Sequence, residues 1–239
     1  MTTTKYTKRV DNRKLDEMRP IKAKIGVIKR ADGSAMFQIG DTIAIAAVYG
    51  PRELYPRFLK NPECGILRCN YDMMSFSVPE RKKPGPSRRS VEISLVTEQA
   101  LNPVLDLELF PNSVVDVFIE IVQANSGTRC AGICAASMAL AHAGIPMKDL
   151  VAAISVGKVG DKIVIDLNKE EEDFEGGATD IPVAISPRNG EVTLLQLDGE
   201  ITKDELMTAL NLAKKGCEQI YKVQKQALKE AFKGADHDE

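Results

Sequence analysis

Polar and apolar positions alternate along the first half of the chain in a way that predicts a β-sheet. Residues 22–29 (KAKIGVIK) alternate charged and apolar side chains, which is the period-two pattern of a half-buried strand. Residues 42–49 (TIAIAAVY) are almost wholly apolar, which predicts a strand buried on both faces. Further strands are predicted at 34–39, 66–76, 114–122, 151–156, 162–166, 181–186 and 191–197.

Apolar side chains at helical spacing predict helices at 88–101, 129–143 and 202–232. Ser126-Gly127-Thr128 offers capping chemistry at the start of the second helix. Gly144 followed by Pro146 is the expected order of residues at its end.

Strands followed by a helix occur twice, which predicts an α+β fold of two similar halves. The halves are expected at 16–147 and 148–232, although no sequence repeat relates them. The polar ends, residues 1–15 and 233–239, are predicted to be flexible.

Composition and charge limit the class of protein. Hydrophobic residues make up 44% and charged residues 28% of the chain, as in ordinary globular proteins. The net charge of −2 argues against a surface that binds nucleic acid all over, so RNA would need a local basic patch. No apolar run is long enough for a signal peptide or a membrane span, and we expect a cytoplasmic protein.

The five cysteines are expected to be reduced core residues. They include no Cys-x-x-Cys pair, and only His142 and His237 could complete a zinc site. His142 lies in an apolar helix and His237 near the end of the chain, which argues against acid–base chemistry by histidine.

A basic cluster precedes and opens the first predicted helix. Residues 81–89 (RKKPGPSRR) contain five cations in nine positions. Composition alone favours a solvated loop, but Arg88 and Arg89 at a helix start oppose the helix dipole. An anion such as phosphate or an RNA backbone would offset that repulsion, and arginine suits phosphate geometry.

A second candidate site is the strand–turn–helix junction at 123–129 (QANSGTR). Free amide groups at a helix start, a glycine that permits close approach, Thr128 and Arg129 together favour an anion. Any capped helix has half of these features, so the junction alone is a weak signal.

An acidic cluster lies at 170–175, where five carboxylates occupy six positions. An exposed acidic loop is the plain interpretation. Asp180 directly precedes an apolar strand, however, and a carboxylate held at a strand end suits a general acid or a metal ligand.

In combination, these segments resemble the RNase PH family, and most closely the catalytic RNase PH-like subunits of archaeal exosomes. The resemblance rests on ordered stretches at 9–42, 46–53, 84–94, 123–150, 166–185 and 192–202. It implies the RNase PH fold, two related β/α halves of the ribosomal-protein-S5-domain-2 type. It also implies a phosphate-dependent 3′→5′ exoribonuclease that releases nucleoside diphosphates from single-stranded RNA and can run in reverse.

The resemblance further implies partners: an inactive paralogue that alternates with this chain in a hexameric ring of three heterodimers, and cap subunits with S1, KH or zinc-ribbon modules. It assigns Ser126, Gly127, Thr128 and Arg129 to inorganic phosphate, and Arg88 and Arg89 to RNA. It assigns Asp173 and Asp180 to general acid and divalent metal (Mg²⁺ or Mn²⁺), with Asp180 favoured for the metal.

Two features depart from the family pattern. The family spaces its two aspartates six positions apart, whereas Asp173 and Asp180 are seven apart, so Glu172 and Glu175 are alternatives to Asp173. A basic residue expected near the ring entry is replaced by Cys64, which leaves Arg57, Lys60 or Arg68 to contact RNA. A stand-alone tRNA-trimming RNase PH and a non-catalytic ring subunit are the alternative functions.

Overall fold

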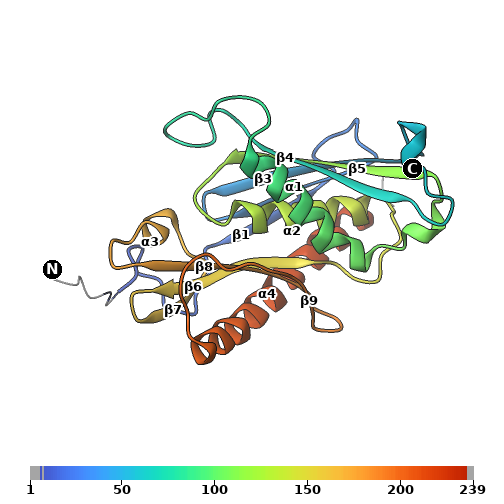
Figure 1. The fold of residues 1–239 in the computed structure, drawn as a ribbon. Coiled ribbons are helices and arrows are strands. Elements are labelled where there is room, and N and C mark those ends of the chain that lie inside the picture. Colours follow the sequence, from blue (N-terminus) through green and yellow to red (C-terminus); the bar gives the residue numbers. More distant parts are fainter. Residues whose placement is uncertain (1–5, 7, 236–239) are drawn as a thin grey trace.

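The computed structural model describes Tyr6 and residues 8–235 (Figure 1). In the first half, a five-stranded sheet has the order β1-β2-β3-β5-β4. Its strands are β1 (Ile21–Ile25), β2 (Gly33–Ile39), β3 (Thr42–Glu53), β4 (Ile66–Met73) and β5 (Ser113–Gln123). All neighbours are antiparallel except β4 and β5, which are parallel. Helix α1 (Arg88–Leu101) forms the crossover that this parallel pair requires.

The second half is a four-stranded antiparallel sheet of order β7-β6-β8-β9. Its elements are β6 (Ala152–Val159), β7 (Lys162–Ile165), the one-turn helix α3 (Lys169–Glu172), β8 (Ala178–Ser186), β9 (Glu191–Leu195) and α4 (Lys203–Ala235). Helix α4 packs against this sheet and also against β1. The helix therefore continues past residue 232, where a flexible tail was predicted to begin; residues 236–239, including His237, lie outside the described residues.

Helix α2 (Thr128–His142) lies between the two sheets, and Figure 1 shows it at the centre of the molecule. Its residues are small and apolar on every side, and most are buried, because both sheets pack against it. Cys130 and Cys134 are buried there, as Cys69 and Cys217 are elsewhere, which confirms the prediction for these four; Cys64, in the loop before β4, is only half-buried and does not belong to the core. The two halves therefore share one hydrophobic core, and the start of α2 lies where they meet.

The predicted helices and strands are confirmed with shifts of a few residues at their ends, and the α+β class is confirmed. Strand β3 differs in one respect: its residues alternate between buried and half-buried instead of being buried on both faces. Helices α1 and α2 cover one face of the first sheet, so only alternate side chains of β3 reach the core. His142 is half-buried, and its Nδ1 accepts a hydrogen bond from the Ser34 amide at 3.1 Å.

The predicted flexibility of residues 1–15 is wrong for the described part of that segment. Arg9 is only 2% exposed and forms an ion pair with Glu171 at 2.7 Å, while the Ile165 amide donates to the Leu15 carbonyl at 3.0 Å. Polar composition suggested a solvated tail, but the second half of the molecule supplies buried acceptors for these side chains. Residues 1–5 and 7 lie outside the described residues.

Glu171 gives a stability prediction with a defined pH dependence. Burial by itself raises the pKa of Glu171, but hydrogen bonds from Arg9 and Tyr6 outweigh it and hold that pKa below its ordinary value. The contribution to stability is thus present above the unfolded pKa of about 4.3 and is lost as the pH falls through the lower folded pKa. Glu171→Gln should cost about 3–5 kcal/mol at pH 7, because Arg9 is left buried without its counter-charge.

Urea unfolding of both proteins at pH 7 and at about pH 3 measures this difference, which should shrink at the lower pH. Glu170→Gln is the matched control, since Glu170 lies on the same helical turn and is exposed. Equal losses from the two substitutions would contradict the prediction.

Candidate functional site

The start of α2 is an uncapped helix terminus that faces a cavity. Ser126 and Gly127 both have left-handed backbone conformations (φ 62° and 65°), and Gly127 is the N-cap residue without any side-chain capping bond. The predicted capping by this turn is therefore wrong. The Ser126 hydroxyl instead donates to the Glu172 carboxylate, and the first amide groups of α2 are left to bind a ligand.

Thr128 adds an unsatisfied donor at the same terminus. Its residue is 6% exposed, and its Oγ1 atom is buried without a hydrogen-bond partner. The Tyr71 hydroxyl adjoins it and also makes no hydrogen bond of good geometry, although Thr128 is close enough to oppose the rise that burial causes in the pKa of Tyr71. A buried hydroxyl without a partner is costly, so its presence beside free amide groups indicates a site for an anion with several acceptor oxygens.

Arg129 is held in place by two residues that the sequence reasoning missed. Its Nη1 atom donates to the Gln196 side-chain oxygen and lies 3.7 Å from Glu92 Oε1. Gln196 Nε2 donates to the same Glu92 atom at 3.1 Å, which closes the network between α1, α2 and the segment after β9. In the sequence, only the position of Gln196 within the family-like stretch 192–202 indicated that it could belong to the site.

Asp180 lies on β8 at the junction of the two halves. It accepts a hydrogen bond from the Ser155 hydroxyl, and it forms an isolated backbone bridge with Asp198. Burial, together with the Asp198 charge, raises the pKa of Asp180 above its ordinary value, although the Ser155 hydrogen bond and the charges of Arg129 and Arg89 oppose the rise. Asp180 is half-buried, and a partly buried carboxylate with a raised pKa is typical of an acid or of a cation ligand.

Helix α3 presents two different carboxylates. Glu172 is half-buried, contacts Ser126, and has a pKa raised by burial and by the nearby Asp180 charge. Asp173 is exposed and pairs with Lys169 at 2.7 Å. Both line one cavity of about 650 Å³ together with Ser126, Gly127 and Thr128. Asp180 is not among the residues that line this cavity, but its charge contributes to the raised pKa of Glu172, the alternative to Asp173 that the spacing had left open.

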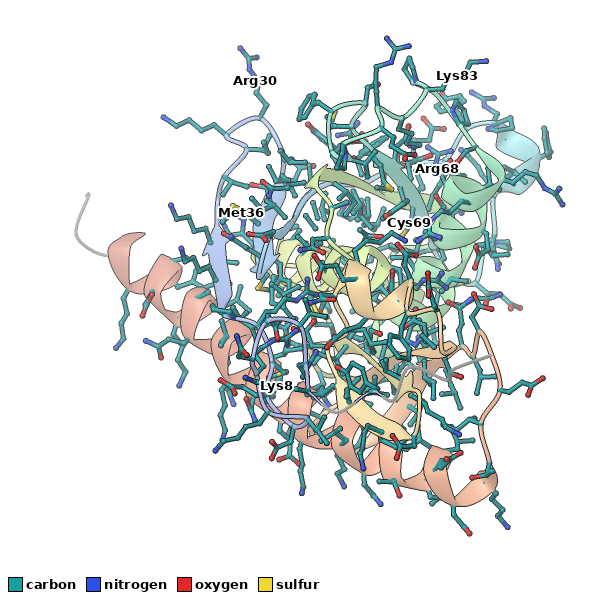
Figure 2. The ribbon with its side chains drawn as sticks, turned by 90° about the vertical axis from the view of Figure 1, so that its left-hand side faces the viewer. Lys8, Arg30, Met36, Arg68, Cys69 and Lys83 are labelled. Atoms are coloured by element: carbon teal, nitrogen blue, oxygen red, sulfur yellow. The ribbon has the colours of Figure 1, made fainter. Side chains whose placement is uncertain are left out.

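The two arginines at the start of α1 are placed differently. Ser87 caps this helix by accepting from the Ser90 amide at 3.1 Å, and Arg88 and Arg89 are exposed on its first turn. Arg89 lines the cavity, whereas Arg88 does not. The preceding loop carries Lys83 into solvent at the edge of the molecule in Figure 2. Of this basic cluster, Arg89 is therefore the residue that the structure places at the cavity, while Lys82 pairs with Asp72.

The other predicted RNA contacts lie at the far end of the first sheet. Arg57 and Lys60 belong to the loop between β3 and β4, which is tied to the start of β5 by an Asn112 to Asn61 hydrogen bond of 2.8 Å. The cavity adjoins the end of β5, and an 11-residue strand is roughly 35 Å long. Figure 1 shows this loop in cyan at the end of the molecule opposite α3.

Arg68, on β4, is paired with an acidic residue of the neighbouring strand. Its guanidinium binds both carboxylate oxygens of Asp116 at 2.6 and 3.0 Å, and its side chain remains 45% exposed. Figure 2 labels it beside Cys69, whose side chain is buried on the other face of the strand. Lys60 likewise pairs with Glu53, at 2.6 Å. These three cations form a second region, separate from the cavity.

Among Tyr6 and residues 8–235, no three His, Cys, Asp or Glu side chains gather into a metal-binding group. Mg²⁺ is commonly held by one or two carboxylates completed by substrate phosphates. Asp180 fits that description as a hard oxygen donor, and Glu172 and Asp173 on the cavity wall are further oxygen donors.

Within the described residues, no helix is both long and apolar enough to span a membrane.

Comparison with known proteins shows similarity to exosome components. The chain is 57% identical over 225 residues to the exosome complex component Rrp41 of Thermococcus kodakarensis, covering 94% of this chain and 90% of that protein. It is 52% identical to the exosome complex component Rrp41 of Methanopyrus kandleri, covering 95% and 94%.

Solved structures agree on the fold. The crystal structure of rice Rrp46 superposes with a TM-score of 0.82 at 24% identity, covering 92% of this chain and 100% of that one. A chain of the Archaeoglobus fulgidus exosome with RNA bound to the active site gives 0.76 at 22% identity, covering 89% and 91%. Two family models, described as domains 1 and 2 of the 3′ exoribonuclease family, match residues 17–146 and 149–216. The chain therefore belongs to the RNase PH family of 3′ exoribonucleases.

Proposed function

We propose that this chain is the catalytic subunit of an archaeal exosome, a phosphate-dependent 3′→5′ exoribonuclease that acts on single-stranded RNA. The observation that carries the proposal is the unsatisfied anion site at the start of α2. Free amide groups and the unpartnered Thr128 hydroxyl meet Arg89 and the Glu172 carboxylate in one cavity. The similarity to archaeal exosome components named Rrp41 supports the same function.

Inorganic phosphate is the proposed co-substrate. Ser126, Gly127, Thr128 and Arg129 would hold it, with the α2 amides and the Arg129 guanidinium offsetting its charge. Arg88 and Arg89 would hold the RNA backbone beside it, which reduces the repulsion between an anionic nucleophile and an anionic diester.

In the proposed reaction, a phosphate oxygen bonds to the phosphorus of the last nucleotide, and the bond from that phosphorus to the preceding 3′-oxygen breaks. The 3′-oxygen takes a proton, and a nucleoside diphosphate leaves; the reverse reaction adds a 3′ tail. Glu172 is the proposed proton donor, because it is half-buried, bonded to Ser126 and has a raised pKa, and Asp173 is the alternative.

Asp180 would hold a Mg²⁺ or Mn²⁺ ion together with phosphate oxygens, with Asp173 as the second candidate ligand, because Glu172 is assigned to the proton. Such an ion, when bound, stabilises negative charge on phosphoryl and departing oxygens. Ser155 keeps the Asp180 carboxylate directed by donating a hydrogen bond to it.

The proposed partners are an inactive RNase PH-like paralogue, in a ring of three heterodimers, and cap subunits with S1, KH or zinc-ribbon modules. An exposed apolar surface on α1 and the β9 segment supports a protein partner: Val91 is 62% and Leu195 48% exposed. Arg57, Lys60 and Arg68 would contact RNA at the ring entry, and the complex would act in the cytoplasm.

The test is a degradation assay with a single-stranded RNA labelled along its length, for the chain alone and mixed with its paralogue. Diphosphates released only with phosphate, Mg²⁺ and the paralogue are the expected result. Activity of the chain alone would favour a stand-alone RNase PH, and no diphosphate in any mixture would favour a structural subunit. Monophosphates released without phosphate would overturn the mechanism.

Thr128→Val should raise the KM for phosphate about tenfold with a smaller effect on kcat, since a hydrogen bond to a charged group is worth about 1.5–3 kcal/mol. Phosphate titration in the same assay measures it. The matched control is Thr97→Val, because Thr97 is a buried threonine inside α1 whose hydroxyl donates to the Ile93 carbonyl at 2.7 Å. An unchanged KM for phosphate would remove Thr128 from the proposed site.

A further inference from the structure

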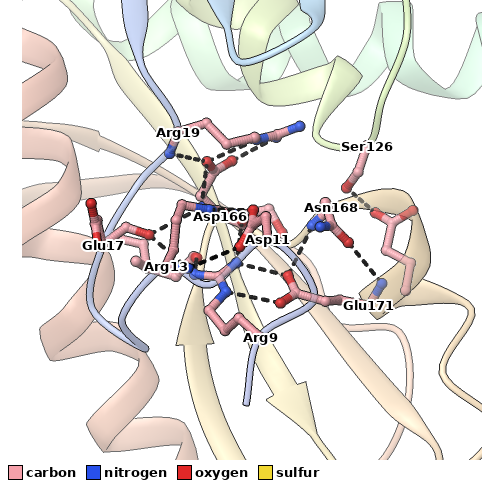
Figure 3. Close-up of polar contacts among 12 residues, drawn as sticks. Arg9, Asp11, Arg13, Glu17, Arg19, Ser126, Asp166, Asn168 and Glu171 are labelled. Atoms are coloured by element: carbon pink, nitrogen blue, oxygen red, sulfur yellow. Dashed lines mark hydrogen bonds and ion pairs between the residues drawn. The ribbon is translucent and has the colours of Figure 1, made fainter.

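Arginines from the start of the chain reach both walls of the candidate site. Figure 3 shows Arg9, Arg13 and Arg19 converging on Asp166 and Glu171, which flank the beginning of α3. We call Tyr6 and residues 8–19 the N-terminal brace. None of its residues is among those that line the cavity, and the proposed chemistry uses none of its contacts.

The first contact fixes α3. Arg9 Nε and Nη2 bind the two Glu171 oxygens at 2.8 and 2.7 Å, and both side chains are 0% exposed. The remaining guanidinium hydrogens go to backbone carbonyls, including those of Ile165 and Asp166 at 2.8 Å. The Tyr6 hydroxyl donates to Glu171 at 2.7 Å. Both Glu171 carboxylate oxygens are thus held by buried hydrogen-bond donors.

Glu171 also forms the helical turn itself. Its amide donates to the Asn168 side chain at 2.9 Å, and its carboxylate accepts from the Asn168 amide at 3.1 Å, so the two residues form a capping box. Successive residues of a helix point about 100° apart, because the helix has 3.6 residues per turn. Holding Glu171 inward therefore directs Glu172 toward Ser126 and the cavity.

The second contact fixes the loop before α2. Arg19 binds Asp166 through Nε at 2.9 Å and Nη2 at 2.6 Å, and its Nη1 donates to the Asn125 carbonyl. Asn125 directly precedes Ser126 and Gly127, whose left-handed conformations leave the α2 amides uncapped. The Arg19 guanidinium also lies 3.6 Å from where a side chain on Gly127 would begin. Arg19 therefore contacts the loop before α2 at both Asn125 and Gly127.

We propose that the N-terminal brace positions the two halves of the catalytic site: Arg9 and Tyr6 set Glu172 and Asp173 through Glu171, and Arg19 sets the phosphate loop through Asn125. This inference rests on the proposed function. The brace residues are positioning residues, since the cavity is lined by the residues that they hold and not by the brace itself. The N-terminal brace would thereby align Glu172, which belongs to the second half, with the anion site at the start of α2, which belongs to the first.

The first test uses Tyr6→Phe and Arg9→Lys in the complex with the paralogue. Arg9→Lys retains the charge but loses the two parallel hydrogen bonds to Glu171. Removing a hydrogen-bond partner that orients a reacting group lowers rates about tenfold or more. We expect kcat to fall about tenfold for Arg9→Lys and at least about twofold for Tyr6→Phe, with the KM for phosphate nearly unchanged. Arg19→Lys should instead raise the KM for phosphate.

Tyr221→Phe is the matched control for Tyr6→Phe. The Tyr221 hydroxyl also donates to a half-buried carboxylate, that of Asp149, at 2.9 Å. Tyr221 lies on α4 and does not line the cavity. Thermal unfolding of each variant shows how much is folded, and wild-type diphosphate release in the same assay tests the proposed function separately. Tyr6→Phe retains the Arg9 to Glu171 ion pair, so it remains informative if Arg9→Lys does not fold.

A selective fall in kcat for the Tyr6 variant, absent for the Tyr221 variant, supports the brace. Folded variants of Tyr6 and Arg9 with wild-type kcat and KM would overturn it, as would equal losses in the Tyr6 and Tyr221 variants, which would indicate a general effect on stability. If the wild-type complex releases no diphosphates, the proposed function fails, and hydrogen exchange at 168–173 in Tyr6→Phe then tests the brace: faster exchange supports it, and unchanged exchange overturns it.

Discussion

Asp180→Asn should lower kcat about 10³-fold in the complex with the paralogue, while RNA binding stays within about twofold of the wild type. Asparagine keeps the size of the side chain and an oxygen that can accept from Ser155, so the change removes the charge with little effect on packing. The residue is half-buried on β8, and the charges of Arg129 and Arg89 act on its carboxylate. The arginines proposed for the RNA backbone are unaffected.

Single-turnover release of diphosphates measures the first effect, and filter binding of the same RNA measures the second. Asp161→Asn serves as the control, because Asp161 is an exposed carboxylate in the turn between β6 and β7. Near-normal phosphorolysis by Asp180→Asn would show that this carboxylate has no catalytic role.

Glu172→Gln should lower kcat about 10²-fold, whereas Asp173→Asn should lower it about threefold at most. A proton donor must be held near the departing oxygen and must carry its proton at working pH. Glu172 meets both conditions better than Asp173, since burial raises its pKa and Ser126 anchors it. Asp173 is exposed and paired with Lys169.

The two variants form their own matched pair, because they are adjacent carboxylates changed to amides on the same turn. Steady-state kinetics at saturating phosphate compare them. A large loss in Asp173→Asn with near-normal Glu172→Gln would reverse the assignment and make Asp173 the proton donor.

Local patterns carried the element predictions. Apolar spacing gave α1 at 88–101, and the strands followed from alternation and from turn residues, because these signals act between neighbours in the chain. Clustered cations and carboxylates of opposite sign, at 81–89 and 170–175, also pointed to a site. The ordered combination of these segments indicated the family, but it did not show which side chains contact one another.

The residues that the sequence misassigned or missed share one cause: their partners are distant in sequence. Ser126 suits an N-cap locally, but its backbone conformation directs the hydroxyl to Glu172, 46 residues away. Arg9 and Tyr6 suit a solvated tail, but their acceptor is Glu171, 162 and 165 residues away. Gln196 and Glu92, which hold Arg129, lie 104 positions apart.

The sequence by itself determined the family, the helices and strands, and the residue types available for phosphate, RNA and acid chemistry. Only the tertiary structure decided which carboxylates and which arginine line the cavity, and that Tyr6 and Arg9 of the N-terminal segment bind Glu171. The physical reason is that spacing along the chain fixes the direction of a side chain within its own element. Burial, hydrogen-bond partners and pKa depend on what the opposite half of the molecule brings to it.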